Sequence, residues 1–233
     1  MRNSRRTSVA RAGVRSLGEV LITAGLVLLL FCVYQLVWTN IEANHEQGKV
    51  TDTLRQEWAK QGGTQLPTGT TALAKPQPGK GFAFLHIPRL GRKYSVPIVQ
   101  GVSLPDLSRG VGHYPSTALP GVVGNFAVAG HRATNGQPFA YLDAVKVGDS
   151  LVVETRSTWF SYVVDKVQIV QPNAVWVIEP VPGKPHQVPT RQLITLTTCN
   201  PRWASTQRLI VFGHLTSTQP TADGRPPALA KSH

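Results

Sequence analysis

The chain has 233 residues, of which 41% are hydrophobic, and its formal net charge is +12. This length accommodates one mid-sized domain of about 100 to 150 residues with appendages, and it excludes two domains of full size. The positive charge suits nucleic acid, anionic lipid or an anionic cell-wall polymer as a partner, and charge alone does not choose among them.

The N-terminal region predicts a membrane anchor. Residues 20–38, VLITAGLVLLLFCVYQLVW, carry no charge, and as a helix they would extend about 28 Å, enough to cross a bilayer. Arginines precede this run without any acid among them, namely Arg2, Arg5, Arg6, Arg11 and Arg15. By the positive-inside rule, residues 1–19 are a cytoplasmic basic head, 20–38 are a single-pass anchor in membrane lipid, and the remainder is extracellular. A buried helix of a soluble protein is the alternative interpretation.

The segment that follows the anchor has two parts. Residues 39–80 form the predicted juxtamembrane segment and linker, of which 41–60 lack proline and can extend the helix. The stretch from residue 61 to the start of the domain is rich in Gly, Thr and Pro, so we expect a flexible tether. The catalytic domain is expected at 81–218, and residues 219–233 are expected to form a disordered tail.

Strand signals dominate from residue 82 onward, because short runs of β-branched and aromatic residues alternate with Pro and Gly. We predict strands at 82–87, 95–100, 125–131, 150–156, 162–170, 193–199 and 208–215. Short helices are expected near 104–110 and 137–148, and neither is long enough to cover a sheet. The pattern is typical of an all-β protein, either a closed or nearly closed barrel or a sandwich.

Cys199 is the only cysteine outside the predicted anchor, since Cys32 lies within it. The two cysteines cannot pair within one chain, so Cys199 is either an inert buried residue or a thiol kept for its chemistry. Strand alternation puts Thr195, Thr197 and Cys199 on one face. Cys199 also ends its strand beside a loop, which is where a rigid scaffold commonly presents a reacting group.

Arg208 begins the next predicted strand, after a loop at 200–207. In an antiparallel hairpin, Cys199 and Arg208 would flank this loop and face each other at about 5 Å between their β-carbons. A guanidinium at that distance favours a thiolate and can stabilise an oxyanion formed by attack on a carbonyl. A solvated cation at a strand end is the alternative interpretation.

A cysteine nucleophile also needs a proton donor for its leaving group, most often a histidine. Five of the seven histidines lie in the juxtamembrane stretch, the tail, a Pro-rich loop or a strand interior, namely His45, His233, His186, His86 and His214. The other two, His113 in GVGHYPST and His131 in NFAVAGHR, follow small residues. Because His131 ends an apolar strand as Cys199 does, the pattern favours His131 and leaves His113 open.

These residues together resemble the sortases, the membrane-anchored cysteine transpeptidases of Gram-positive bacteria. The nucleophile motif of that family, TLxTC, matches TLTTC at 195–199. The family's arginine matches Arg208 in QRLIV, and its histidine matches His131 in AGHR. The resemblance covers about residues 81–218, and within the family it is most similar to class E sortases of actinobacteria.

The resemblance implies an eight-stranded sortase-type β-barrel in which Cys199, His131 and Arg208 are the catalytic residues. Tyr114 of HYPST, in a segment that the resemblance places near the substrate groove, and Thr198, next to the nucleophile, are the expected substrate-binding residues. An ordinary half-buried loop tyrosine is the alternative interpretation of Tyr114.

The implied reaction is cleavage of an LAxTG- or LPxTG-type sorting signal between Thr and Gly through a thioester on Cys199. The exported protein is then transferred to the amine of a peptidoglycan precursor. No metal or organic cofactor is expected, since the sparse acids offer no carboxylate cluster for calcium. Nucleic acid is not an expected partner, because the densest arginine cluster is a topology signal. The alternatives are an anchored cysteine hydrolase, a pilus-polymerising sortase, and a non-catalytic basic wall-binding module.

Overall fold

The computed structural model describes residues 2–60 and 75–230, and the chain divides into two units that meet between Asn40 and Ile41. Helix α1 runs from Arg2 to Lys60. Within the described part of the chain it is the one helix long and apolar enough to cross a membrane, judged by length and composition. The large apolar side chains that the structure describes between Val20 and Trp38 are exposed, as lipid-facing side chains are. Most of the predicted tether, residues 61–74, lies outside the described residues.

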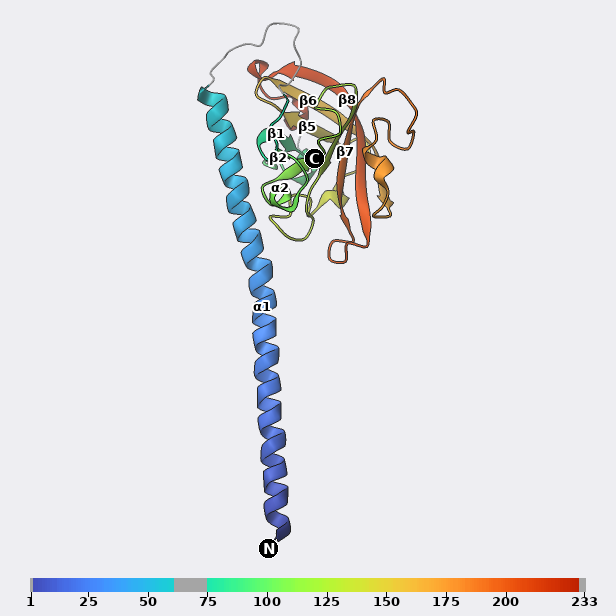
Figure 1. Cartoon of the computed structure of the whole chain (residues 1–233). Helices are drawn as coiled ribbons and strands as arrows, with labels where there is room; N and C mark the ends of the chain where they lie inside the picture. The colour runs from blue at the N-terminus through green and yellow to red at the C-terminus, as the bar shows by residue number, and fades with distance from the viewer. Residues whose placement is uncertain (1, 61–74, 231–233) are drawn as a thin grey trace. The chain divides into compact units, whose positions relative to one another are not determined.

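Eight strands, all between residues 81 and 220, close into one barrel in the order β1-β2-β3-β4-β7-β8-β6-β5 (Figure 1). They are β1 (Gly81–His86), β2 (Val96–Gln100), β3 (Val111–His113), β4 (Gly124–Ala129), β5 (Ser150–Glu154), β6 (Thr158–Val170), β7 (Gln192–Asn200) and β8 (Gln207–Pro220). The pairs β2–β3 and β4–β7 are parallel, and the other neighbours are antiparallel. The expected eight-stranded barrel is therefore confirmed.

Helical structure in the barrel unit is confined to short pieces. They are η1 (Pro88–Leu90), α2 (Leu104–Ser108), η2 (Leu142–Ala144), η3 (Val175–Ile178), η4 (Thr221–Asp223) and η5 (Pro227–Leu229). Helix α2 starts with a capping box, in which Ser103 and Asp106 each bond the other's main-chain N–H. The short helix expected near 104–110 is thus present, whereas 137–148 contains only the turn η2.

The strands differ from the predicted ranges mainly at their ends. β3 was not predicted, because three residues with a central glycine carry too little pattern. β6 starts earlier and β8 ends later than predicted, since their pairing continues to Thr158 and Pro220. The residues added to β8 are mostly polar, whereas those added to β6 include the buried Trp159 and Phe160. In the expected tail, η4 and η5 follow β8 directly, and Pro226 is buried.

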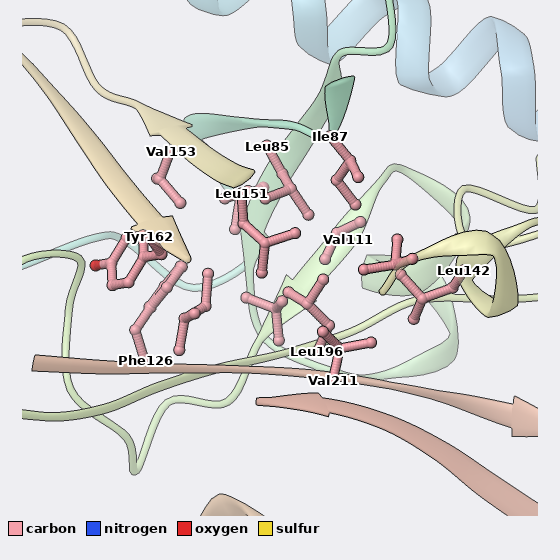
Figure 2. Close-up of a cluster of buried hydrophobic side chains, with 14 of the residues drawn as sticks. Leu85, Ile87, Val111, Phe126, Leu142, Leu151, Val153, Tyr162, Leu196 and Val211 are labelled. Atoms are coloured by element: carbon pink, nitrogen blue, oxygen red, sulfur yellow. The ribbon is translucent and has the colours of Figure 1, made fainter. Parts of the chain in front are cut away.

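The barrel interior is filled by apolar side chains from alternate strand positions (Figure 2). Phe126 of β4, Leu196 of β7 and Val211 of β8 are all fully buried there. Because Leu196 points inward, its neighbours Thr197 and Thr195 point outward. The packing of Leu196 in the core thus places Cys199, two residues after Thr197, on the outer face of β7.

The barrel unit also includes the last turns of α1, residues 41–60. Leu54 is buried, and Arg55 donates two hydrogen bonds to the Glu154 carboxylate of β5 at 2.5 and 2.7 Å. The Trp58 ring meets the Phe84 ring edge to face, at 5.4 Å between centroids. This part of the helix is therefore packed against β1 and β5.

Candidate active site

The predicted hairpin of β7 and β8 is present, and Cys199 pairs directly with Arg208 in its register. Cys199 is a free, half-buried thiol. The Nη1 group of Arg208 donates to the carbonyl oxygens of Ser205, at 2.9 Å, and Gln207, at 2.8 Å. The guanidinium is thus held at the start of β8, and it has further N–H groups with which to bind a substrate carbonyl.

His131 follows β4, the other neighbour of β7. The strand predicted for 125–131 ends at Ala129, two residues before the histidine. Ala129 of β4 pairs with Thr197, and the Gly130 N–H donates to the Thr197 carbonyl at 3.1 Å. If this parallel register is extended by two residues beyond Ala129, His131 corresponds to Cys199. Cys199 and Arg208 therefore lie on the adjacent strands β7 and β8, and His131 lies in the loop directly after β4, the strand on the other side of β7.

The two histidine candidates have different surroundings. His113 is fully buried in β3, with Nδ1 at 2.7 Å from the Gln100 side chain and Nε2 at 3.0 Å from the Ala118 carbonyl. Burial lowers the pKa of His113 to about 4. His131 is half-buried, and burial lowers its pKa as well. Since both nitrogens of His113 are occupied, the geometry favours His131 for proton transfer.

The expected substrate-binding residues, Tyr114 and Thr198, lie on different faces. The half-buried Tyr114 places its hydroxyl 3.3 Å from the hydroxyl of Thr197, on the outer face of β7 near Cys199. Thr198 is buried, and its hydroxyl donates to the Gly130 carbonyl at 2.7 Å. A substrate contact by Thr198 stays a prediction that its burial does not favour.

Arg132 is a residue that the sequence patterns did not single out. It is buried, and its Nη1 donates to the Cys199 carbonyl at 3.3 Å and to the Asn200 side chain at 2.6 Å. Its Nη2 pairs with Asp143 at 3.1 Å. Arg132, the residue after His131, therefore links the loop after β4 to the end of β7 that carries Cys199. Its place directly after His131 was the only available signal.

The outer face of β4 and β7 is covered at the end away from Cys199. Asn125 donates to the carbonyls of Val177 and Glu179 at 3.1 and 3.0 Å, and it accepts a bond from Thr195 at 2.8 Å. The segment that contains η3 thus closes this end of the face. Access to the face is left at the end where Cys199 lies.

One group of possible metal ligands occurs among the described side chains, formed by Glu42, His45 and Glu46 on α1. Their ligand atoms lie within 4.8 Å of one another, and Glu46 also binds Lys49 at 2.6 Å. None of these residues belongs to the site at Cys199.

A closed barrel with a cysteine and an arginine on paired strands, and a histidine just after the next strand, is an arrangement that suits a cysteine acyl-transfer enzyme. A family model described as a sortase domain matches residues 85–216, more than half of the chain. The chain therefore belongs to the sortase family, whose members are cysteine transpeptidases.

Named relatives support the resemblance to class E. The chain is 38% identical over 234 residues to sortase SrtE1 of Streptomyces coelicolor, an alignment that covers 97% of this chain and 64% of that relative's length. The fold is similar to sortase E from Streptomyces avermitilis, with 45% identity, a TM-score of 0.61, and coverage of 66% of this chain and 99% of that one. It is also similar to sortase E1 from Streptomyces coelicolor with a tripeptide in the active site, at 41% identity, a TM-score of 0.60 and the same coverage.

Proposed function

We propose that this protein is a membrane-anchored sortase that cleaves an LAxTG- or LPxTG-type signal between Thr and Gly. It then transfers the exported protein to the amine of a peptidoglycan precursor. The observation that carries the proposal is the strand register of β7, which pairs Cys199 with Arg208 on one side and pairs Thr197 with Ala129, two residues before His131, on the other.

In the first half of the reaction, the thiolate of Cys199 attacks the carbonyl carbon of the signal's threonine. The free guanidinium N–H groups of Arg208 stabilise the oxyanion that forms. The protonated His131 gives its proton to the departing glycine amine, the C–N bond breaks, and a thioester remains on Cys199. Tyr114, on the same outer face, contacts the bound peptide.

In the second half, the acceptor amine attacks the thioester. Neutral His131 takes the proton of that amine, and the Cys199 thiolate leaves as the new amide forms. Burial lowers the pKa of His131, which favours the neutral ring that this step needs. Each turnover returns the thiol and the imidazole to their starting states.

The anchoring part of the proposal is supported by the long apolar helix and by the arginines that precede it. We place the N-terminus in the cytoplasm and the barrel outside the cell. A membrane-impermeant maleimide applied to intact cells should then label Cys199, and a Cys199→Ala variant should remain unlabelled. Labelling only after lysis would contradict this topology.

The reaction is tested with the purified full-length chain in detergent. The chain is incubated with an LAxTG or LPxTG peptide and an excess of a glycine-based amine, and the products are analysed by mass spectrometry. We expect a thioester adduct on Cys199 and a ligated peptide, with neither in the Cys199→Ala variant. Hydrolysed peptide without any ligated product would instead identify a cysteine hydrolase.

A further inference from the structure

We propose that Asn135, held by the juxtamembrane part of α1, is a positioning residue that orients the imidazole of His131. This inference rests on the proposed function, since it concerns the group that moves the proton in that reaction. It assigns to residues 41–60 a part in the chemistry in addition to their place beside the anchor.

The first observation is the contact between the two side chains. Asn135 Nδ2 lies 3.3 Å from His131 Nε2. The loop after β4 curls back to make this contact, and the Phe139 N–H closes the loop on the His131 carbonyl at 3.0 Å. Asn135 has φ 52° and Gly136 has φ 72°. Asparagine and glycine are the residues that adopt this left-handed conformation most readily, so the Asn-Gly pair suits the turn.

The contact determines which ring nitrogen is free. With Nε2 facing the Asn135 amide, Nδ1 has no hydrogen bond to any described residue, and it is the atom that can exchange a proton with the substrate. Because Nδ1 gives and takes the proton, Nε2 keeps its hydrogen in both the neutral and the protonated ring. The Asn135 amide oxygen, turned toward the ring by a rotation of the side chain, accepts from that N–H in both states. Asn135 can therefore hold the ring in both of the protonation states that the reaction uses.

The second observation is that α1 supports this turn from behind. Gln47 Nε2 donates to the Asn135 carbonyl at 3.4 Å. The approach at Gly136 is so close that a β-carbon there would overlap the Gln47 amide and lie 3.0 Å from Asn44 Oδ1. A cavity of about 290 Å³ adjoins the turn, lined by Gln47, Gly136, Gln137 and Arg202 among others. The cavity leaves one side of the turn without packing contacts. The position of the turn therefore depends on its contacts with Gln47.

The charged neighbours of the site are few. Besides the thiol of Cys199, those among the described residues are Arg208 on β8, the buried Arg132 with its exposed partner Asp143, and Arg202, which binds Gln137 in the same turn. The residues of α1 that meet the turn, Asn44 and Gln47, are uncharged. A charge introduced at position 135 would therefore act on His131 without an existing carboxylate beside the ring.

The test uses the full-length chain in detergent and the peptide ligation assay, with kcat, KM, the pH profile and the melting temperature measured for each variant. Asn135→Gly keeps the left-handed backbone and removes only the amide, so we expect kcat to fall about 10- to 100-fold, with KM and the melting temperature nearly unchanged. Asn135→Asp puts a carboxylate beside the ring, so the pH profile should shift to higher pH.

The support by α1 is tested with Gln47→Ala, which should lower kcat several-fold in the same assay. Lys49→Ala is its matched control on the same helix, because Lys49 bonds only Glu46, and its kcat should stay at the wild-type value. Wild-type kcat and pH profile in both Asn135 variants would overturn the proposal. The proposal would also be overturned if Asn135→Gly lost kcat only in proportion to a lower melting temperature and Asn135→Asp left the pH profile unchanged. Failure of the proposed function is distinguishable, since the wild-type chain itself would then form no thioester.

Discussion

Cys199 and Arg208 face each other across the β7–β8 hairpin, and the partners of the Arg208 guanidinium among the described residues are two carbonyl oxygens rather than a carboxylate. The positive charge beside the thiol is thus held in position without being neutralised. Such a guanidinium can stabilise the negative charge that develops on the substrate's carbonyl oxygen during the reaction.

Replacing Arg208 should therefore impair chemistry more than folding. We expect Arg208→Ala to lower kcat/KM for ligation about 100- to 1,000-fold, as loss of an oxyanion-stabilising donor does elsewhere. Stability should change by only about 1 kcal/mol, because the bonds lost are loop contacts at a half-buried residue. Arg208→Lys should restore little activity, since an ammonium cannot bind the loop carbonyls and the substrate together. Full activity in Arg208→Lys would show that charge alone suffices.

Tyr114 should affect substrate binding more than turnover. Its hydroxyl makes only a long contact with Thr197, so it remains able to donate to a peptide carbonyl. We expect Tyr114→Phe to raise KM about 10-fold with kcat nearly unchanged, in line with the loss of one hydrogen bond. Comparing LAxTG with LPxTG peptides would show whether the phenol distinguishes them. An unchanged KM for both peptides would assign Tyr114 to loop packing.

His113 should make the barrel less stable in acid. Its pKa of about 4 lies below the ordinary value of 6.5, so between these pH values the unfolded chain binds a proton that the folded chain does not. Stability is therefore lost as the pH falls from about 6.5 to about 4, by an amount on the order of 3 kcal/mol. Urea denaturation of His113→Gln should show a shallower loss over this range. His186→Gln, in an exposed loop, is the control. The prediction would be contradicted if the free energy of unfolding fell equally with pH in the wild type, His113→Gln and His186→Gln.

The contact of Arg55 with Glu154 should stabilise the docking of residues 41–60. Burial opposes ionisation of Glu154, but hydrogen bonds from Arg55 and His86 outweigh it and hold the pKa of this carboxyl below its ordinary value. Its contribution is thus present at neutral pH and lost as the pH falls through that lowered pKa. We expect Arg55→Met to cost about 1 kcal/mol, since Arg55 is 44% exposed and partly screened by solvent. A double-mutant cycle with Glu154→Gln measures the coupling, and a coupling of zero would contradict the prediction.

The fold was predictable where side chains alternate strongly. β7 shows this best, because its inward residues are apolar and its outward ones are threonines that lead to Cys199. β3 and the far end of β8 were not predictable, since their glycine-containing or polar residues become strands only through pairing with neighbours. The packing of residues 41–60 was missed because it depends on a few well-separated residues, such as Leu54 and Trp58.

The site was predictable only in part for a similar reason. The facing of Cys199 and Arg208 follows from the geometry of a short hairpin, which is local in the sequence. The choice of His131 over His113 came from the family resemblance, because the pairing of β4 with β7 joins residues far apart in the chain. The contacts of Arg132 and Asn135 follow from how the loop after β4 folds, which no periodicity encodes.

The separation of Cys199 from the end of β4 is set by a ladder of main-chain hydrogen bonds and by the ties that Arg132 makes across it. Main-chain pairing does not depend on which side chains the surrounding loops carry. Loops such as 114–123 and 171–191 can therefore change in sequence, and with them the peptides that the enzyme accepts, while the reacting groups keep their spacing. In such a barrel, new substrate preferences can evolve without any rebuilding of the chemistry.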